Sequence, residues 1–259
     1  MHRMFHGFFP AYFHWWHIPV VFLAGMVGEA YGSVIGGGGI LLQSVQVFLG
    51  VPIKSAIANG NTGGMGTEAG IISETYPDIT SNKKLTLEIT IPFTLGGIIG
   101  IWLLLNVSPN VIKYIMIGAV LSILAHAYYA RGRKRSTHIN RSQHVVLFVF
   151  MLLSGTYGAF IGPGEGAFSK FALMSVLGLS FIQGQGIKAA ATVPSRIYST
   201  ILTAAAGLIV WPYTLTLLVS TFIGAKYATK VAKKIPNPYL MAGLTVVSLA
   251  FVVYLLFFY

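Results

Sequence analysis

The 259-residue sequence contains no cysteine and very little charge. Without a thiol, the chain cannot form a disulfide, a thiolate nucleophile or a cysteine-ligated metal site. Only 9% of the residues are charged, whereas soluble domains have about 25%. Because 55% of the residues are also hydrophobic, the composition predicts a polytopic membrane protein.

The sequence also lacks the short motifs of several enzyme classes. It has no Gly-x-Ser-x-Gly nucleophile elbow and no His-Glu-x-x-His metal motif. Asp78 follows Pro77 in a stretch that we expect to be a loop, so no aspartate is expected inside a span. These absences argue against an intramembrane enzyme, and we expect neither a cofactor nor a metal site.

Long apolar runs are what the sequence does contain. A helix satisfies its own backbone hydrogen bonds, which lipid cannot do, and the runs are too long and continuous for a barrel. The fold class predicted is all-α, a transmembrane helical bundle. The expected segments lie at about 18–35, 40–49, 53–73, 87–106, 110–130, 144–161, 167–178, 184–208, 212–232 and 238–259.

Residues 1–17 form an arm rich in Phe, Trp and His. No basic region precedes a clear cleavage site there, so we predict no signal peptide. The aromatic side chains suit an anchor at the membrane interface. The spacing of His2, His6, His14 and His17 could suggest a metal ion, but a wet, aromatic-flanked interfacial segment is the favoured interpretation.

The net charge of +11 indicates membrane topology. In a soluble protein this charge would suggest binding to nucleic acid, but no Lys/Arg patch lies on a soluble domain here. The excess instead follows the rule that cytoplasmic loops of membrane proteins are basic. The strongest basic stretch, 131–143, is expected to be a cytoplasmic linker that also meets anionic lipid.

Two glycine-dense breaks interrupt apolar segments about 126 residues apart, at 32–40 and 158–166. Glycine costs roughly 1 kcal/mol and proline roughly 3 kcal/mol inside a helix, so neither stretch favours a continuous helix. Other features recur at similar offsets, such as Gly100 and Gly224. The chain is therefore predicted to contain two similar repeats.

Charge placement distinguishes two topologies for these repeats. If each break is a re-entrant hairpin, each half makes three crossings, the second half is inverted, and the basic clusters share one side. If each break and its flanks form one crossing, the cluster ending at Lys234 lies outside. We prefer the inverted arrangement, with an interfacial arm, a first repeat, a basic linker and a second repeat at 1–17, 18–130, 131–143 and 144–259.

The residues that follow the first break resemble the sulfite exporter TauE/SafE family, also called the toluene sulfonate uptake permease family. The resemblance lies in the glycine run, Leu49-Gly50-Val51-Pro52 and Ala56-Ile57-Ala58-Asn59, and continues in 158–192 and 222–226. It covers nearly the whole chain from about Gly25. The departures are Asn59, Gln43-Ser44, Ser169-Lys170, Pro163 and Glu165.

The resemblance implies a multi-pass secondary transporter of a prokaryotic inner membrane, for small sulfur-containing anions such as sulfite or organosulfonates. Export is the expected direction. The expected partners are the small anionic substrate and the lipid bilayer, without nucleic acid, and the oligomeric state is left open.

The glycine breaks are the first candidate for the substrate site. Half-helices are expected to begin at Ile40 and Ala167, and a helix N-terminus carries about +0.5 charge and binds anions. Inverted copies would bring two such ends together around one compact oxyanion. Tight helix packing through small residues is the alternative. The candidate glycines are Gly36, Gly37, Gly38, Gly39, Gly162, Gly164 and Gly166.

Polar side chains downstream of the breaks form the second candidate set. Arg196 suits bidentate recognition of oxygens, and Lys188 would act as a point charge. The alternatives are a snorkelling Lys188, a structural Arg196–Glu68 pair and interhelical hydrogen bonds for the asparagines. The predicted substrate-binding side chains are Gln43, Asn59, Asn61, Gln185, Lys188 and Arg196.

Three acids, Glu29, Glu68 and Glu165, are candidates for proton coupling. Glu165 is expected within the second glycine loop, where it could instead gate access or repel the substrate, and Glu29 could lie near the interface. The leading hypothesis is a secondary transporter that works by alternating access around the paired broken helices. The alternative is a passive anion channel, or a transporter of another small organic or inorganic anion.

Overall fold

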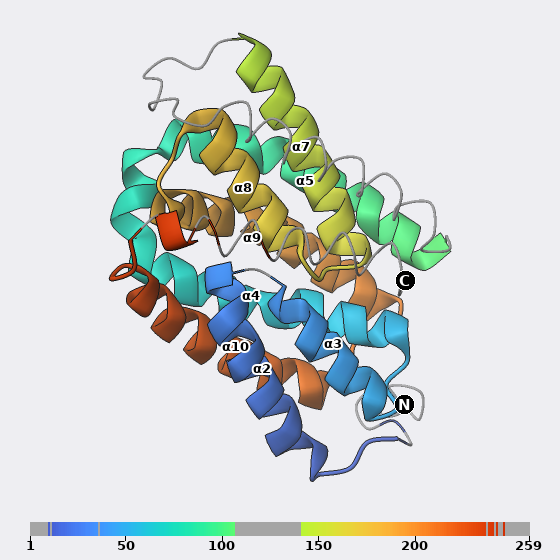
Figure 1. Cartoon of the computed structure of the whole chain (residues 1–259). Helices are drawn as coiled ribbons and strands as arrows, with labels where there is room; N and C mark the ends of the chain where they lie inside the picture. The colour runs from blue at the N-terminus through green and yellow to red at the C-terminus, as the bar shows by residue number, and fades with distance from the viewer. Residues whose placement is uncertain are drawn as a thin grey trace.

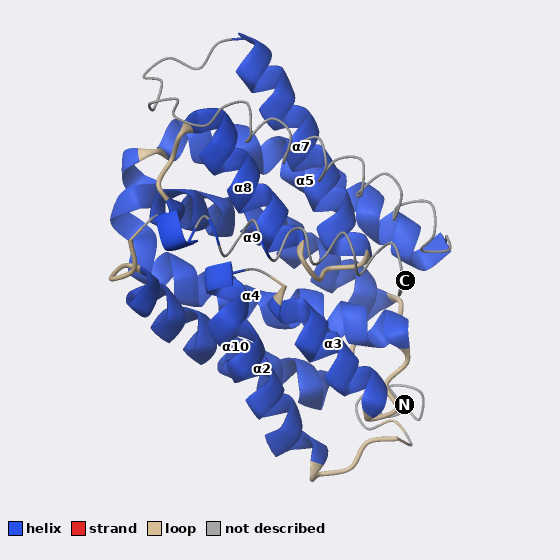
Figure 2. Ribbon diagram, viewed as in Figure 1, coloured by secondary structure: helices blue, strands red, loops and turns tan. Residues whose placement is uncertain are grey.

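The computed structural model describes residues 10, 12–35, 37–106, 141–236, 238–240, 242 and 246. Every regular element within these ranges is an α-helix (Figure 2). The named helices are α2 (His17–Ile35), α3 (Gly38–Phe48), α4 (Ile53–Ser81), α5 (Lys83–Asn106), α7 (Arg141–Phe160), α8 (Glu165–Leu177), α9 (Phe181–Ala205) and α10 (Trp211–Ala232).

Each of these helices matches one predicted segment within a few residues, except that α4 is longer at its end. The predicted segment at 110–130 lies outside the described residues, as do most of 1–17, 131–143 and 238–259.

The predicted loop at Asp78 is wrong, because α4 continues through Pro77 to Ser81. Polar side chains beyond the proline bind the carbonyl groups of the last turn of α4. Thr80 donates a hydrogen bond to the carbonyl of Pro77, and both Ser81 and Asn82 donate to the carbonyl of Asp78. These bonds satisfy carbonyl groups that a helix end leaves without partners.

Two long helices, α4 and α9, pack against each other at the centre of the molecule (Figure 1). α10 packs on α2 and α4, while α5 packs on α7 and α9. α3 lies against α2 and α4, and α8 lies against α7 and α9. When α2, α3, α4 and α5 are matched in order with α7, α8, α9 and α10, each of these contacts has a counterpart.

Glycines allow these helices to approach closely. A β-carbon on Gly66 of α4 would lie 2.1 Å from the carbonyl oxygen of Leu218 in α10. On Gly96 of α5 it would lie 2.0 Å from the carbonyl oxygen of Leu152 in α7. Both distances are shorter than any van der Waals contact, so the backbones meet where only glycine fits.

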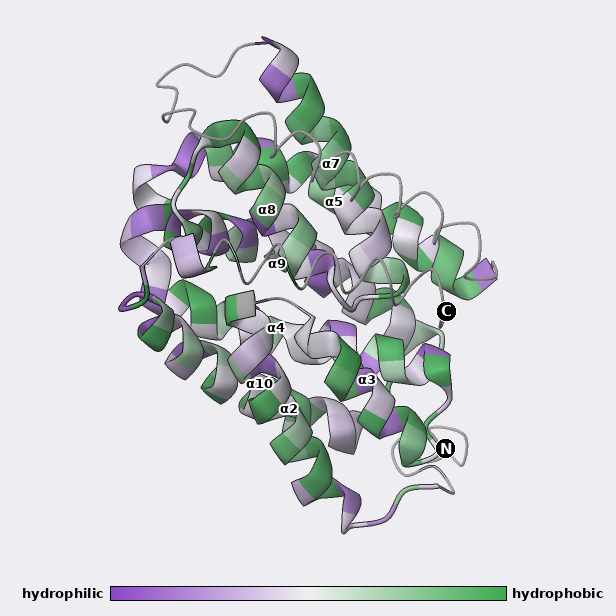
Figure 3. Ribbon diagram, in the orientation of Figure 1, coloured by the Kyte–Doolittle hydropathy of each residue, from purple (hydrophilic) through white to green (hydrophobic). Residues whose placement is uncertain are grey.

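The helices bury polar residues and expose apolar ones. α2, α5 and α7 have stretches that are long and apolar enough to cross a membrane, and Figure 3 shows the green, hydrophobic residues along them. α4 and α9, of 29 and 25 residues, are also long, but both bury charged side chains. Exposed apolar side chains, such as Trp102 at 59%, face outward. This is the pattern expected of a membrane bundle.

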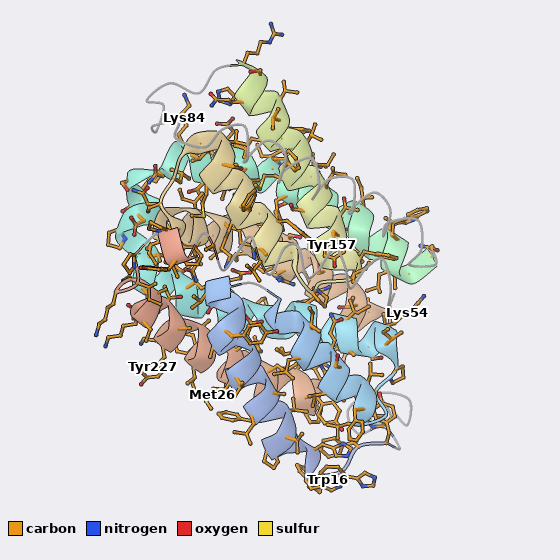
Figure 4. The ribbon with its side chains drawn as sticks, viewed as in Figure 1. Trp16, Met26, Lys54, Lys84, Tyr157 and Tyr227 are labelled. Atoms are coloured by element: carbon orange, nitrogen blue, oxygen red, sulfur yellow. The ribbon has the colours of Figure 1, made fainter. Side chains whose placement is uncertain are left out.

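Several basic residues at the ends of the described helices lie at one end of the bundle. Lys233, just after α10, contacts Glu74 near the end of α4, and α5 begins beside them at Lys83. His144 of α7 contacts Glu88 of α5 at this same end. Lys54 starts α4 at the opposite end, and Figure 4 shows Lys84 and Lys54 far apart.

Candidate functional site

The two glycine breaks are turns that require left-handed backbone. Gly37 has φ 82° directly before α3, and Gly162 and Gly164 have φ 93° and 88° directly before α8. The half-helices therefore begin at Gly38 and Glu165, two residues earlier than predicted, because the chain reverses at the left-handed glycine and turns helical at once. The prediction that Glu165 lies in the loop is wrong, since it is the first residue of α8.

The two turns meet inside the molecule. A β-carbon on Gly39 would lie 3.3 Å from the Cα of Pro163, so the two glycine breaks are in contact. They are also joined by two hydrogen bonds of the same kind, each donated by the sixth residue of a half-helix. Gln43 donates to the carbonyl of Ile161 over 2.8 Å, and Lys170 donates to that of Ser33 over 2.8 Å.

A cavity of about 80 Å³ lies where the turns meet α4 and α9. Its charged lining consists of three carboxylates and three cationic groups, so the formal charges cancel. These residues are Glu29, Glu68, Glu165, Lys170, Lys188 and Arg196.

Most of the predicted site residues line this cavity. From the substrate-binding set these are Gly37, Gly38, Gly39, Gln43, Asn61, Gly162, Gly164, Gly166, Gln185, Lys188 and Arg196. All three coupling candidates, Glu29, Glu68 and Glu165, join them. Gly36 lies outside the described residues.

Asn59 is not part of the cavity lining. Its side-chain oxygen accepts hydrogen bonds from the backbone N–H of Val210 and the hydroxyl of Thr214, and its nitrogen donates to Gln46. The side chain is fully buried and joins α3, α4 and α10. For Asn59, the interhelical hydrogen-bonding alternative is therefore the correct one.

Lys188 lies between two carboxylates. Its Nζ is 2.9 Å from Oε2 of Glu165 and 3.2 Å from Oε1 of Glu68. The lysine is 7% exposed, so the snorkelling alternative is wrong. Two carboxylates on one ammonium group offset the cost of burying its charge.

Arg196 reaches the same cavity from further along α9. Its Nη1 donates to Oδ1 of Asn61 over 2.6 Å, and its Nη2 lies 3.8 Å from Oε1 of Glu68. The Arg196–Glu68 pair considered from the sequence is thus present. Gly64 makes room for the guanidinium, because a β-carbon there would lie 3.1 Å from its central carbon.

Glu29 lies at the N-terminus of α3. Its Oε1 would be 3.1 Å from a β-carbon on Gly38, the first residue of that helix. Glu29 therefore belongs to the lining of the central cavity.

Lys170 is a cavity residue that sequence reasoning missed. It is 3% exposed, and its ammonium group lies 5.0 Å from the centre of the Phe181 ring. The signal was available, because an ionisable residue inside an apolar segment normally faces a partner or a cavity.

Several buried polar atoms of the cavity residues have no hydrogen-bond partner within the described part of the chain. They are Thr67 Oγ1, Glu68 Oε2, Gln185 Oε1 and Arg196 Nε. Buried polar atoms are normally paired, so these atoms indicate a polar ligand or water. Arginine Nε–H is a donor and the glutamine carbonyl an acceptor, so the cavity can bind both acceptor and donor atoms.

Comparison with known proteins adds to this geometry. The model of the sulfite exporter TauE/SafE family matches residues 21–255. The chain belongs to this family. Its members and relatives are named as membrane transporters rather than enzymes.

The relatives match over most of each chain at low identity. The chain is 24% identical to the probable membrane transporter protein YfcA of Escherichia coli K12, over 82% of this chain and 80% of that protein. It is 23% identical to the probable membrane transporter protein ORF9 of Sinorhizobium sp., over 92% of both chains. A probable membrane transporter protein of Haemophilus influenzae is 22% identical over 82% of this chain and 84% of its own length. No solved structure matches significantly.

Proposed function

We propose that the protein is a secondary transporter of small sulfur-containing oxyanions, such as sulfite or a short organosulfonate, with export as the expected direction. The observation that carries this proposal is the central cavity. Lys188 and Arg196 line it where the first turns of α3 and α8 converge, and the Nε of Arg196 lacks a partner among the described residues. Cations and helix N-termini together favour an anion with several acceptor oxygens.

The size of the cavity favours a compact substrate. A cavity of about 150 Å³ is known to hold benzene, and this one measures about 80 Å³. The space therefore favours a compact anion such as sulfite or methanesulfonate.

Alternating access around two inverted repeats is the mechanism that we propose. It is supported by the matching contacts of the two groups of helices and by the equivalent hydrogen bonds of Gln43 and Lys170. In Figure 1 the α2–α3 hairpin and the α7–α8 hairpin approach the centre from opposite sides. We further propose that the basic end of the bundle faces the cytoplasm of a prokaryotic cell, in its inner membrane.

The charge balance of the cavity supports proton coupling. Each cation already has a carboxylate nearby, so an added anion would leave an excess negative charge in a buried space. Protonation of Glu29, Glu68 or Glu165 would remove that excess. We therefore propose that a proton accompanies the anion.

Flux measurements in proteoliposomes test this function. We expect saturable sulfite flux and uphill accumulation driven by a pH gradient. Flux strictly down the anion gradient would instead show a passive channel. No response to sulfite, thiosulfate or methanesulfonate would contradict the proposal.

A further inference from the structure

Glu165 lies where an incoming anion would bind most favourably. It is the first residue of α8, and a negative charge at a helix N-terminus is stabilised by the helix dipole. Its carboxylate contacts Lys188 over 2.9 Å and accepts a hydrogen bond from the hydroxyl of Ser169. The side chain is only 2% exposed, so the protein already holds an anion of its own at this point.

Glu165 also borders a second space. Glu165 and Arg196 line both the central cavity and a smaller cavity of about 10 Å³. Three hydroxyl residues of α9 also line that smaller cavity, namely Thr192, Ser195 and Ser199. The Glu165 side chain therefore has polar neighbours beyond the central cavity.

Gly158 provides the room that Glu165 needs. A β-carbon at Gly158 would lie 2.6 Å from the Cγ of Glu165, which is shorter than any ordinary contact. The glycine of α7 and the glutamate of α8 thus fit each other, and the position of the carboxylate is built into the second hairpin.

We propose that Glu165 is a tethered competitor of the transported anion. It occupies Lys188 and the α8 N-terminus in the empty protein, and it leaves them when the substrate binds. This inference rests on the proposed function and states how the same site is controlled.

Electrostatic repulsion makes the two occupants exclude each other. Two like charges a few ångström apart in a buried site repel much more strongly than they would in water. Lys188 already contacts Glu68 as well, so a substrate anion beside it would create a third negative neighbour.

Of the two carboxylates on Lys188, Glu165 is the one to move. Glu68 lies near both Lys188 and Arg196, whereas Glu165 forms an ion pair with Lys188 alone among the described residues. Fewer cations therefore oppose the departure of Glu165.

The test is equilibrium binding of radiolabelled sulfite to detergent-purified protein. We expect Glu165→Gln to tighten sulfite binding about tenfold, because the amide no longer competes for Lys188. The matched control is Glu29→Gln, which removes a carboxylate from the same cavity that forms no ion pair with a described residue. We expect only a small gain for Glu29→Gln, since no lysine is released.

A second measurement uses the space that Glu165→Ala would open. Acetate matches the CH2–COO⁻ group that this substitution removes, so we expect acetate to displace sulfite from Glu165→Ala at concentrations that leave the wild type unaffected. Thermal unfolding of each variant shows that it is folded.

Three results would overturn the inference. The first is equal or weaker sulfite binding by Glu165→Gln, and the second is an equal gain in Glu29→Gln, which would indicate a general field effect. The third is absence of acetate competition in Glu165→Ala. Absence of sulfite binding in the wild type and in every variant would instead contradict the proposed function itself, so the two failures are distinguishable.

Discussion

Arg196 is the residue whose donors best fit an oxyanion. Its terminal nitrogens face Asn61 and Glu68, and its Nε has no partner among the described residues. We expect Arg196→Lys to weaken sulfite binding about tenfold, because lysine is a point charge without the guanidinium fork. Binding of radiolabelled sulfite measures this effect. The exposed Arg141→Lys is the matched control, and an unchanged affinity in Arg196→Lys would place the anion elsewhere.

Asn59 has a structural role that can be separated from binding. We expect Asn59→Ala to lower the free energy of unfolding by about 1–3 kcal/mol, because the buried N–H of Val210 loses its acceptor. Sulfite affinity of the folded fraction should stay unchanged. Thermal unfolding in detergent and sulfite binding check the two halves of this prediction. A large loss of sulfite affinity in Asn59→Ala would contradict this prediction and would show that Asn59 contributes to the binding site.

Individual charged residues were largely predictable from the sequence, because an ionisable side chain in an apolar segment needs a partner. Lys188, Arg196 and the three glutamates were found in this way. The partners of Asn59 come from α3, α10 and the turn before it, and no local pattern in the sequence indicates such long-range neighbours.

The half-helices show how far local signals define an element. Glycine and proline content located both breaks, because those residues disfavour a continuous helix. The starts of α3 and α8 were placed two residues late, since the sequence does not show which glycine takes the left-handed conformation. Because of this shift, Glu165 is the first residue of α8 and not a loop residue, and the helix dipole stabilises a negative charge there.

Helix packing gives a prediction at the scale of elements. We expect Gly66→Ala to destabilise the protein, because its β-carbon would lie 2.1 Å from a backbone oxygen of α10 and would push α4 away. Gly184→Ala is the matched control, since its β-carbon would meet side chains at an ordinary 3.5 Å. The control should be neutral or stabilising by up to about 1 kcal/mol. Thermal unfolding compares the two, and equal stabilities would contradict the close packing of α4 on α10.

The orientation of the molecule in the membrane can be tested by labelling single introduced cysteines, because the chain has no cysteine of its own. Lys54 and Lys84 lie at opposite ends of the bundle. We expect a membrane-impermeant maleimide to label Lys54→Cys in intact cells, and Lys84→Cys only after permeabilisation. The reverse result would show that the basic end faces outward.

The arrangement of the whole molecule was only partly accessible from the sequence. The repeat offsets predicted two similar groups of helices, which stays a prediction, and the structure adds which helices pack together. The central packing of α4 on α9 was not predictable, because it depends on small residues whose partners lie more than a hundred positions away. The balance of three acids and three bases became visible only when the two turns were brought together.

The pair of hydrogen bonds that joins the two hairpins has a consequence for the resting protein. Gln43 donates from a neutral amide, whereas Lys170 donates from a charged ammonium group when it is protonated, and a charged hydrogen bond is about twice as strong. If the repeats exchange conformations during the cycle, the contact broken in one direction is stronger than its equivalent in the other. Two identical repeats would give two empty states of equal free energy. Because Lys170 of one repeat corresponds to Gln43 of the other, the two empty states should differ in free energy. The empty protein should therefore be open mainly to one side of the membrane.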